Sequence, residues 1–122
     1  MIGIDLIKTS RMRGLIERFG EKALCRFLSK EEIALVKNYK TASGFWAAKE
    51  AFSKALGVGI GSECGFHDIV IYKSENGAPH LRVSKKLLEK FNISDLSLSI
   101  THDGEYAIAV VAVESTSANK IK

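Results

Sequence analysis

Two carboxylates in this sequence occupy positions where an ionised group is unexpected. Asp5 interrupts the short apolar run Ile2–Ile7, and Glu50 lies in the middle of an alanine-rich stretch. A charge in an apolar run needs a partner, and Mg²⁺ in proteins typically takes one or two carboxylates together with water and phosphate. Asp5 and Glu50 are therefore candidates for a shared magnesium site, provided that the fold brings them together.

Glu50 also has a simpler interpretation. Lys54 follows it by four residues, which is the spacing of an ordinary helical ion pair worth ~0.3–0.5 kcal/mol. In a phosphate-handling site Lys54 would instead neutralise charge that grows during the reaction. If Lys54 only pairs with Glu50, Lys49 is the next cation to consider for that task.

Glycines and a histidine add two weaker signals. Gly57, Gly59 and Gly61 allow backbone N–H groups to approach an anion. They close a helix, whereas a dinucleotide fingerprint opens one, so a flexible loop that ends the helix is the alternative. His102 precedes a tight turn, where a surface position is the alternative to a catalytic one.

The elements that must position these residues follow from hydrophobic periodicity and turn signals. Helices are expected early in the chain and hairpins late, with one strand at each end. The expected elements are a strand over Ile2–Ile7, a helix over 11–19 capped by Ser10 and ended by Gly20, a short turn over 21–27, a helix over 30–38 with a Ser29/Glu32 capping box, a helix over 43–56 ended by Gly57, strands over Phe66–Lys73 and Pro79–Val83 around Asn76-Gly77, a helix over Ser84–Phe91, and strands over Leu96–His102 and Glu105–Glu114 around Asp103-Gly104.

This order predicts an α+β fold in which antiparallel strands wrap around the long alanine-rich helix. The last strand is nearly all apolar, which predicts that both of its faces are covered. A chain of 122 residues corresponds to one domain. We assign that domain to residues 1–114 and a polar tail to residues 115–122.

Composition limits the setting in which the protein works. No apolar run approaches the ~20 residues needed to span a bilayer, and the N-terminus lacks the charged and apolar regions of a secretory signal. Cys25 and Cys64 have neither metal-site spacing nor a disulfide framework. We therefore expect a cytoplasmic protein with free thiols and no membrane association.

Positive charge is concentrated in one segment. Residues 8–30 hold seven Lys or Arg against two Glu, a net charge of +5, whereas the whole chain carries +4. Such a segment attracts acidic partners: nucleic acid, anionic lipid or an acidic protein. A solvated helical face is the alternative interpretation.

Taken together and in order, these motifs resemble the holo-(acyl-carrier-protein) synthase family of 4′-phosphopantetheinyl transferases. The resemblance covers about residues 2–114. It rests on Gly3-Ile4-Asp5, Trp46-Ala-Ala-Lys-Glu-Ala-Phe-Ser-Lys-Ala-Leu56, Gly57-Val-Gly-Ile-Gly61, Phe66-His-Asp-Ile-Val-Ile71, Asn76-Gly-Ala-Pro79, Ser99-Ile-Thr-His102 and the acidic Glu114 after the last apolar strand.

The resemblance implies a reaction and its machinery. Phosphopantetheine passes from coenzyme A to a serine of apo-acyl-carrier protein, in fatty acid and lipid biosynthesis, and adenosine 3′,5′-bisphosphate leaves. Mg²⁺ is implied on Asp5 and Glu50, and either Glu50 or a water on Mg²⁺ accepts the serine proton. The family is typically a homotrimer, with the coenzyme in a cleft between subunits.

Further roles come from the same resemblance, residue by residue. Glu50 and Lys54 are implied as catalytic residues. The residues implied to bind coenzyme A are Lys54, Gly57, Gly59, Gly61, Ser99, Thr101 and His102, and those implied to meet the acidic carrier protein are Arg11, Arg18 and Arg26. No nucleic acid is implied.

One position departs from the family pattern. Many members have an arginine where this chain has Phe45, directly before Trp46. If that arginine contacts coenzyme phosphate in the relatives, another cation must serve here, and Lys37 and Lys40 are the nearby candidates.

Two other functions compete with this one. A basic module that binds RNA or an acidic protein without catalysis would explain the charge of residues 8–30, but it leaves Asp5 unexplained. A transferase acting on carrier domains outside fatty acid synthesis would explain every motif.

Overall fold

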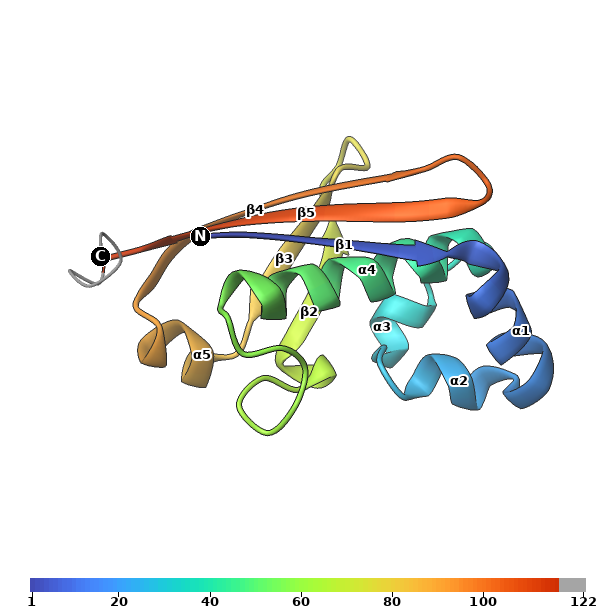
Figure 1. The fold of residues 1–122 in the computed structure, drawn as a ribbon, viewed down its shortest axis with the longest axis horizontal. Helices are drawn as coiled ribbons and strands as arrows, with labels where there is room; N and C mark the ends of the chain where they lie inside the picture. The colour runs from blue at the N-terminus through green and yellow to red at the C-terminus, as the bar shows by residue number, and fades with distance from the viewer. Residues whose placement is uncertain (117–122) are drawn as a thin grey trace.

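The computed structural model describes residues 1–116 and has an α+β fold with antiparallel strands, as predicted. Its centre is the long helix α4, which contacts β1 and β5 more extensively than it contacts any other element (Figure 1). The elements are β1 (Ile2–Lys8), α1 (Thr9–Phe19), α2 (Glu21–Cys25), α3 (Lys30–Ile33), α4 (Tyr39–Ala55), the 3₁₀ turn η1 (Phe66–Asp68), β2 (Ile69–Lys73), β3 (Pro79–Val83), α5 (Lys85–Lys90), β4 (Ile93–His102) and β5 (Tyr106–Ser115).

The strands form two antiparallel sheets. The larger has the order β1-β5-β4, so the first and last strands of the chain are neighbours, and β2 and β3 form a separate hairpin. The larger sheet covers one side of α4 and α1 to α3 lie on its other side, while the β2–β3 hairpin runs past the helix and contacts β4 (Figure 1).

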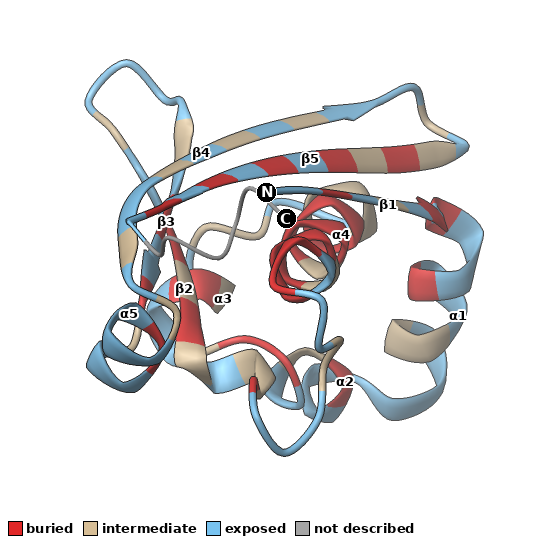
Figure 2. Cartoon of the chain, turned by 60° about the vertical axis from the view of Figure 1, so that its left-hand side comes forward, coloured by how far each residue is buried: buried red, intermediate tan, exposed pale blue. Residues whose placement is uncertain are grey.

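Helix α4 begins earlier than its apolar periodicity indicates. The Asn38 side chain accepts hydrogen bonds from the N–H groups of Lys40 (2.8 Å) and Thr41 (3.4 Å), which is a side-chain N-cap. The chain leaves the helix at Gly57, whose φ of 80° suits glycine. Most of α4 is buried (Figure 2), yet no helix within residues 1–116 is long and apolar enough to cross a membrane.

Strand β1 packs directly against α4 because its inward side chains permit it. Gly3, Asp5 and Ile7 alternate toward the helix. A Cβ on Gly3 would lie 1.8 Å from the carbonyl oxygen of Ala51 and 2.6 Å from the nitrogen of Ala55. Only glycine allows this approach, and the approach places Asp5 two residues further along the same face.

Several predicted boundaries were wrong for local reasons. Helix α1 starts at Thr9, after Lys8, so Ser10 lies within the helix and does not cap it. The Ser29/Glu32 capping box is confirmed, but α3 ends at Ile33. The strand expected from Phe66 begins at Ile69, after η1.

Within residues 1–116, one face of β5 is covered and the other is not, contrary to the prediction from its apolar sequence. Alternate residues from Ala107 to Val113 are buried against α4, whereas Val110 and Ala112 are exposed on the outer face. β5 continues to Ser115, and residues 117–122 of the predicted tail lie outside the described residues.

We expect Gly3→Ala to cost about 1–3 kcal/mol of unfolding free energy, because the added methyl group meets helix backbone that cannot move aside cheaply. Gly14→Ala is the matched control: no atom lies within 4 Å of its added Cβ, and alanine in a helix stabilises by roughly 0.5–1 kcal/mol. Urea unfolding measures both. Equal stability of the two variants would show that β1 does not depend on this contact.

Candidate active site

Asp5 and Lys54 meet where β1 crosses the C-terminal half of α4. The Lys54 Nζ donates to Asp5 Oδ1 at 2.9 Å and more weakly to the Ile4 carbonyl at 3.4 Å. This hydrogen bond raises the pKa of Lys54. Lys54 thus reaches across to the strand, which disagrees with the simpler interpretation of a helical pair with Glu50.

Glu50 lies within electrostatic reach of that pair. Partial burial raises the pKa of Glu50, and the neighbouring Asp5 carboxylate raises it further, while Lys54 and Arg11 act in the opposite direction. The structure therefore brings together the two carboxylates singled out in the sequence, with Lys54 beside them.

This donor set suits Mg²⁺ better than a softer metal. Two carboxylates are a typical protein contribution to a magnesium site. Within residues 1–116, no three His, Cys, Asp or Glu side chains gather as a metal site. Asp5 and Glu50 are both partly exposed, so neither carboxylate is closed off from solvent.

Lys49 is not available to a substrate, although it was the second candidate cation. Its side chain is fully buried and its Nζ lies 2.9 Å from Glu32 Oε1. Burial lowers the pKa of Lys49, and the Glu32 carboxylate opposes that effect. A lysine in this setting serves the fold rather than a leaving group.

The glycine loop begins one turn after Lys54, but its amides are occupied. The N–H groups of Gly57, Gly59 and Gly61 donate to the carbonyls of Lys54 (2.9 Å), Ser53 (3.2 Å) and Cys64 (2.9 Å). This arrangement agrees with the alternative of a loop that ends the helix. In the conformation described here, the three amides do not form an anion cradle.

A separate cavity of about 350 Å³ opens at the N-terminal end of α4. Phe45, which replaces the family arginine, is buried and lines it together with the candidate cations Lys37 and Lys40. His102 lies at the same cavity. Lys73, from the β2 strand, is a fourth basic residue that the sequence did not reveal, because only the folded hairpin brings it here.

Ser99 and Thr101 belong neither to the cluster of Asp5, Glu50 and Lys54 nor to the cavity around Phe45. They pair with Val110 and Ile108 on the outer face of the sheet, whereas Asp5 faces α4. His102 pairs with the inward-facing Ala107, as its register predicts. The predicted coenzyme residues are therefore spread over two faces of a single chain.

The basic segment borders an apolar cavity of about 580 Å³ between α1, α2 and α4. Arg11 and Arg26 lie at this cavity, and Arg18 stacks over Phe19 with its guanidinium carbon 5.2 Å from the ring centroid. The rings of Phe27, Trp46 and Phe66 form its aromatic wall.

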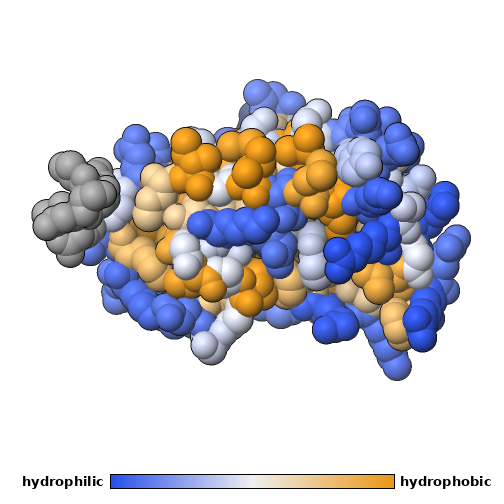
Figure 3. All heavy atoms as spheres, in the orientation of Figure 1, coloured by the Kyte–Doolittle hydropathy of each residue, from blue (hydrophilic) through white to orange (hydrophobic). Residues whose placement is uncertain are grey.

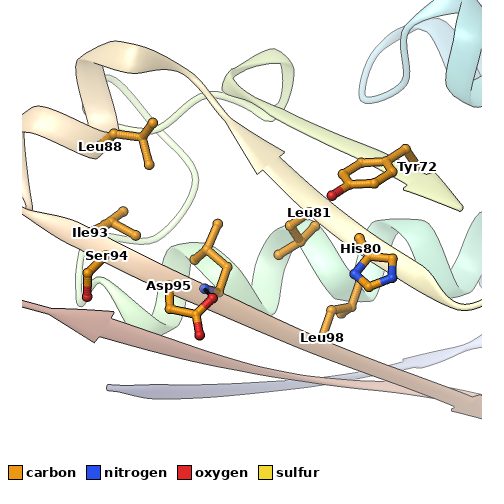
Figure 4. A pocket seen from close by; sticks show the side chains of 9 residues that line it. Tyr72, His80, Leu81, Leu88, Ile93, Ser94, Asp95 and Leu98 are labelled. Atoms are coloured by element: carbon orange, nitrogen blue, oxygen red, sulfur yellow. Dashed lines mark hydrogen bonds between the residues drawn. The ribbon is translucent and has the colours of Figure 1, made fainter. Parts of the chain in front are cut away.

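Another cavity, of about 330 Å³, lies between the β2–β3 hairpin, α5 and β4 (Figure 4). Tyr72 and His80 stack there with ring centroids 5.4 Å apart, and Asp95 of β4 also lines the cavity. None of the residues predicted to act in catalysis or binding lines this cavity.

Comparison with known proteins identifies the family. Residues 1–111 match the model of the 4′-phosphopantetheinyl transferase superfamily. The chain is 74% identical, over 99% of its length and 100% of the relative's, to a holo-(acyl-carrier-protein) synthase of Sulfurimonas denitrificans. The chain therefore belongs to the 4′-phosphopantetheinyl transferase superfamily, and within it to the holo-(acyl-carrier-protein) synthases.

Solved structures extend the likeness to the fold. The Helicobacter pylori holo-(acyl-carrier-protein) synthase in complex with coenzyme A has a TM-score of 0.91 and 50% identity, and the match covers 93% of this chain and 100% of that one. A Bacillus anthracis holo-(acyl-carrier-protein) synthase, in complex with CoA (3′,5′-ADP), has a TM-score of 0.79 and 36% identity over 94% and 96% of the two chains.

Lys54→Met should make stability depend more steeply on pH, because it leaves Asp5 and Glu50 as two like charges. The Lys54 side chain is 52% exposed in its pair with Asp5, so we expect a loss below about 1 kcal/mol at neutral pH. The pKa of Glu50 is raised in the folded state, so Glu50 takes up a proton at a higher pH than it does in the unfolded chain. Protonation removes the repulsion, and the difference from the parent protein should shrink between about pH 7 and pH 4.

Urea unfolding at both pH values tests this expectation. Lys85→Met is the control, since Lys85 forms an exposed pair with Glu89 at 3.7 Å. If the difference in unfolding free energy between Lys54→Met and the parent protein stayed constant with pH, Lys54 would not reduce the repulsion between the two carboxylates.

Proposed function

We propose that this protein transfers 4′-phosphopantetheine from coenzyme A to a serine of apo-acyl-carrier protein. The observation that carries the proposal is the meeting of Asp5, Glu50 and Lys54 at the β1–α4 contact, in a chain of this family. The serine oxygen forms a bond to the β-phosphorus, and the bond from that phosphorus to the bridging oxygen breaks. Adenosine 3′,5′-bisphosphate leaves with the bridging oxygen, and the serine proton passes to a base, for which Glu50 is the candidate side chain.

We infer that Asp5 and Glu50 hold Mg²⁺. When bound, a divalent cation neutralises charge on the pyrophosphate as it is split. The raised pKa of Glu50 beside Asp5 supports this assignment, since two neighbouring carboxylates favour a shared cation.

Lys54 is the proposed cation for the transferring phosphates. In the structure its side chain is half-exposed and its ammonium group pairs with Asp5. A rotation of the side chain alone would turn the ammonium group toward a phosphate of bound coenzyme A, with no change in the helix. A charge fixed beside the breaking bond acts on the transition state more than on the bound coenzyme.

The nucleotide end of coenzyme A is assigned to the cavity around Phe45. Lys37, Lys40 and Lys73 supply positive charge there in place of the missing arginine, and His102 lies beside them. Lys40 and Glu50 are ten residues apart on α4, which corresponds to about 15 Å along the helix.

We also infer a homotrimer with coenzyme A between copies. The outer face of the larger sheet is apolar and exposed, with Ile2 at 74%, Ile4 at 58% and Leu6 at 57% exposure. Hydrophobic side chains gather over β1 and β5 on the face shown in Figure 3. A contiguous apolar patch of this kind marks an interaction surface, and Ser99 and Thr101 of β4 lie on the same outer face of the sheet.

The direct test is incubation of the protein with coenzyme A, Mg²⁺ and apo-acyl-carrier protein, followed by mass spectrometry of the carrier. We expect the serine to gain one phosphopantetheine group. Binding of the carrier without transfer would favour the non-catalytic basic module. Transfer only to carrier domains from outside fatty acid synthesis would favour the second alternative.

Asp5→Asn and Glu50→Gln should each lower affinity for Mn²⁺ at least about tenfold, because each removes a charged ligand. Isothermal titration measures the affinity, and circular dichroism checks that the fold is intact. Glu75→Gln, with the same change of charge in an exposed turn, serves as the control. Mn²⁺ affinity equal to that of the parent protein in both site variants would rule out the shared metal site.

Arg18→Glu and Arg26→Glu should raise the KM for carrier protein and leave the KM for coenzyme A nearly unchanged. Both arginines are exposed in the basic segment, so the effect should weaken with salt, which screens charges beyond about 8 Å at physiological ionic strength. Lys85→Glu on α5 reverses a charge outside that segment. Carrier kinetics that responded equally to all three reversals would place the docking surface elsewhere.

A further inference from the structure

A fully buried ion pair lies directly beside the candidate catalytic residue. Lys49, the neighbour of Glu50 on α4, donates to Glu32 Oε1 at 2.9 Å, to the Phe27 carbonyl at 2.6 Å and to the Phe66 carbonyl at 3.1 Å. An ammonium group has three N–H donors, and all three are used. Nothing in the proposed transfer uses this group.

Glu32 extends the network on its other side. Its Oε1 also accepts from the Ser29 N–H at 2.8 Å, and its Oε2 accepts from the Ile71 N–H at 2.8 Å. The pair thereby joins α3, the segment before it, α4, η1 and β2. A buried ion pair contributes little net stability compared with apolar residues of similar size, so its use here calls for a reason other than stability.

The two carbonyls that Lys49 holds belong to residues of the aromatic wall. The rings of Phe27 and Phe66 lie 5.1 Å and 4.9 Å from the ring of Trp46 between centroids. Trp46 precedes Glu50 by one helical turn. Because Trp46 lines the cavity and lies on the turn of α4 directly before Glu50, this end of the wall adjoins the proposed reaction centre.

We propose that Glu32 and Lys49 are positioning residues that hold Phe27 and Phe66 against Trp46 and so fix the cavity wall on the carrier-facing side of Glu50. This inference rests on the proposed function, in which the basic rim of that cavity meets the carrier protein. The Glu32–Lys49 pair thereby controls the orientation in which the carrier protein presents its serine. Binding of coenzyme A, which is assigned to other surfaces, does not depend on the pair.

The test uses Glu32→Gln/Lys49→Met, which removes both charges and leaves no unpaired buried charge. We expect kcat/KM for the carrier protein to fall about tenfold or more, since small displacements near a reaction centre are costly, while the KM for coenzyme A changes less than about twofold. Trp46 is the only tryptophan in the chain. Its emission should shift to the red and become more accessible to acrylamide.

Glu63→Gln/Lys90→Met is the matched control, because that pair has an N–O distance of 2.8 Å but is exposed. It should change neither the carrier kinetics nor the Trp46 emission. Unchanged carrier kinetics in a folded Glu32→Gln/Lys49→Met protein would overturn the proposal, as would an equal rise in KM for both substrates.

Phe66→Leu keeps the proposal testable if the double variant does not fold, since it trims one ring and leaves the ion pair in place. The same selective loss toward the carrier is expected, and its absence would refute the role of the wall. A parent protein that bound carrier and coenzyme A without transferring phosphopantetheine would instead refute the proposed function. In that case weaker carrier binding by the double variant, with unaltered coenzyme A binding, would still support the positioning role.

Discussion

The close contact between β1 and α4 is the constraint on which the rest of the structure depends. Because Gly3 has no side chain, the strand lies against the helix backbone at Ala51 and Ala55. Two residues later the same face presents Asp5 to Lys54. A strand held further out would leave the carboxylate in solvent, and Glu50 would face no second acid. The Gly3-Ile4-Asp5 motif therefore has two roles: Gly3 allows close packing on α4, and Asp5 supplies a carboxylate to the site.

The two lysines of α4 show how burial separates roles that sequence leaves mixed. Lys49 and Lys54 are both near Glu50 in sequence. Lys49 is enclosed and its three donors are used by Glu32 and two carbonyls, whereas the half-exposed Lys54 places its charge beside the carboxylates and pairs with Asp5 at 2.9 Å. Lys49 binds the backbone of the aromatic wall, whereas Lys54 remains available to phosphate. The two lysines are only five residues apart on the same helix.

The sequence was sufficient to predict most helices and strands and to single out Asp5, Glu50 and Lys54. It was not sufficient for features that depend on contacts between distant parts of the chain. The alanine-rich helix and the Ser29/Glu32 capping box follow from local signals. The pairing of Glu32 with Lys49 and Ile71, and the position of Lys73 at the Phe45 cavity, depend on segments far apart in the chain. The apolar sequence of β5 predicted that both faces are covered, but within residues 1–116 only the face toward α4 is.

Anomalous diffraction from crystals grown with Mn²⁺ and coenzyme A would test most directly whether the β1–α4 contact builds a phosphoryl-transfer site. The account predicts one manganese peak coordinated by the Asp5 and Glu50 carboxylates, with pyrophosphate oxygens completing the coordination and the Lys54 ammonium moved from Asp5 toward phosphate. A manganese peak elsewhere, or pyrophosphate bound away from both carboxylates, would contradict it.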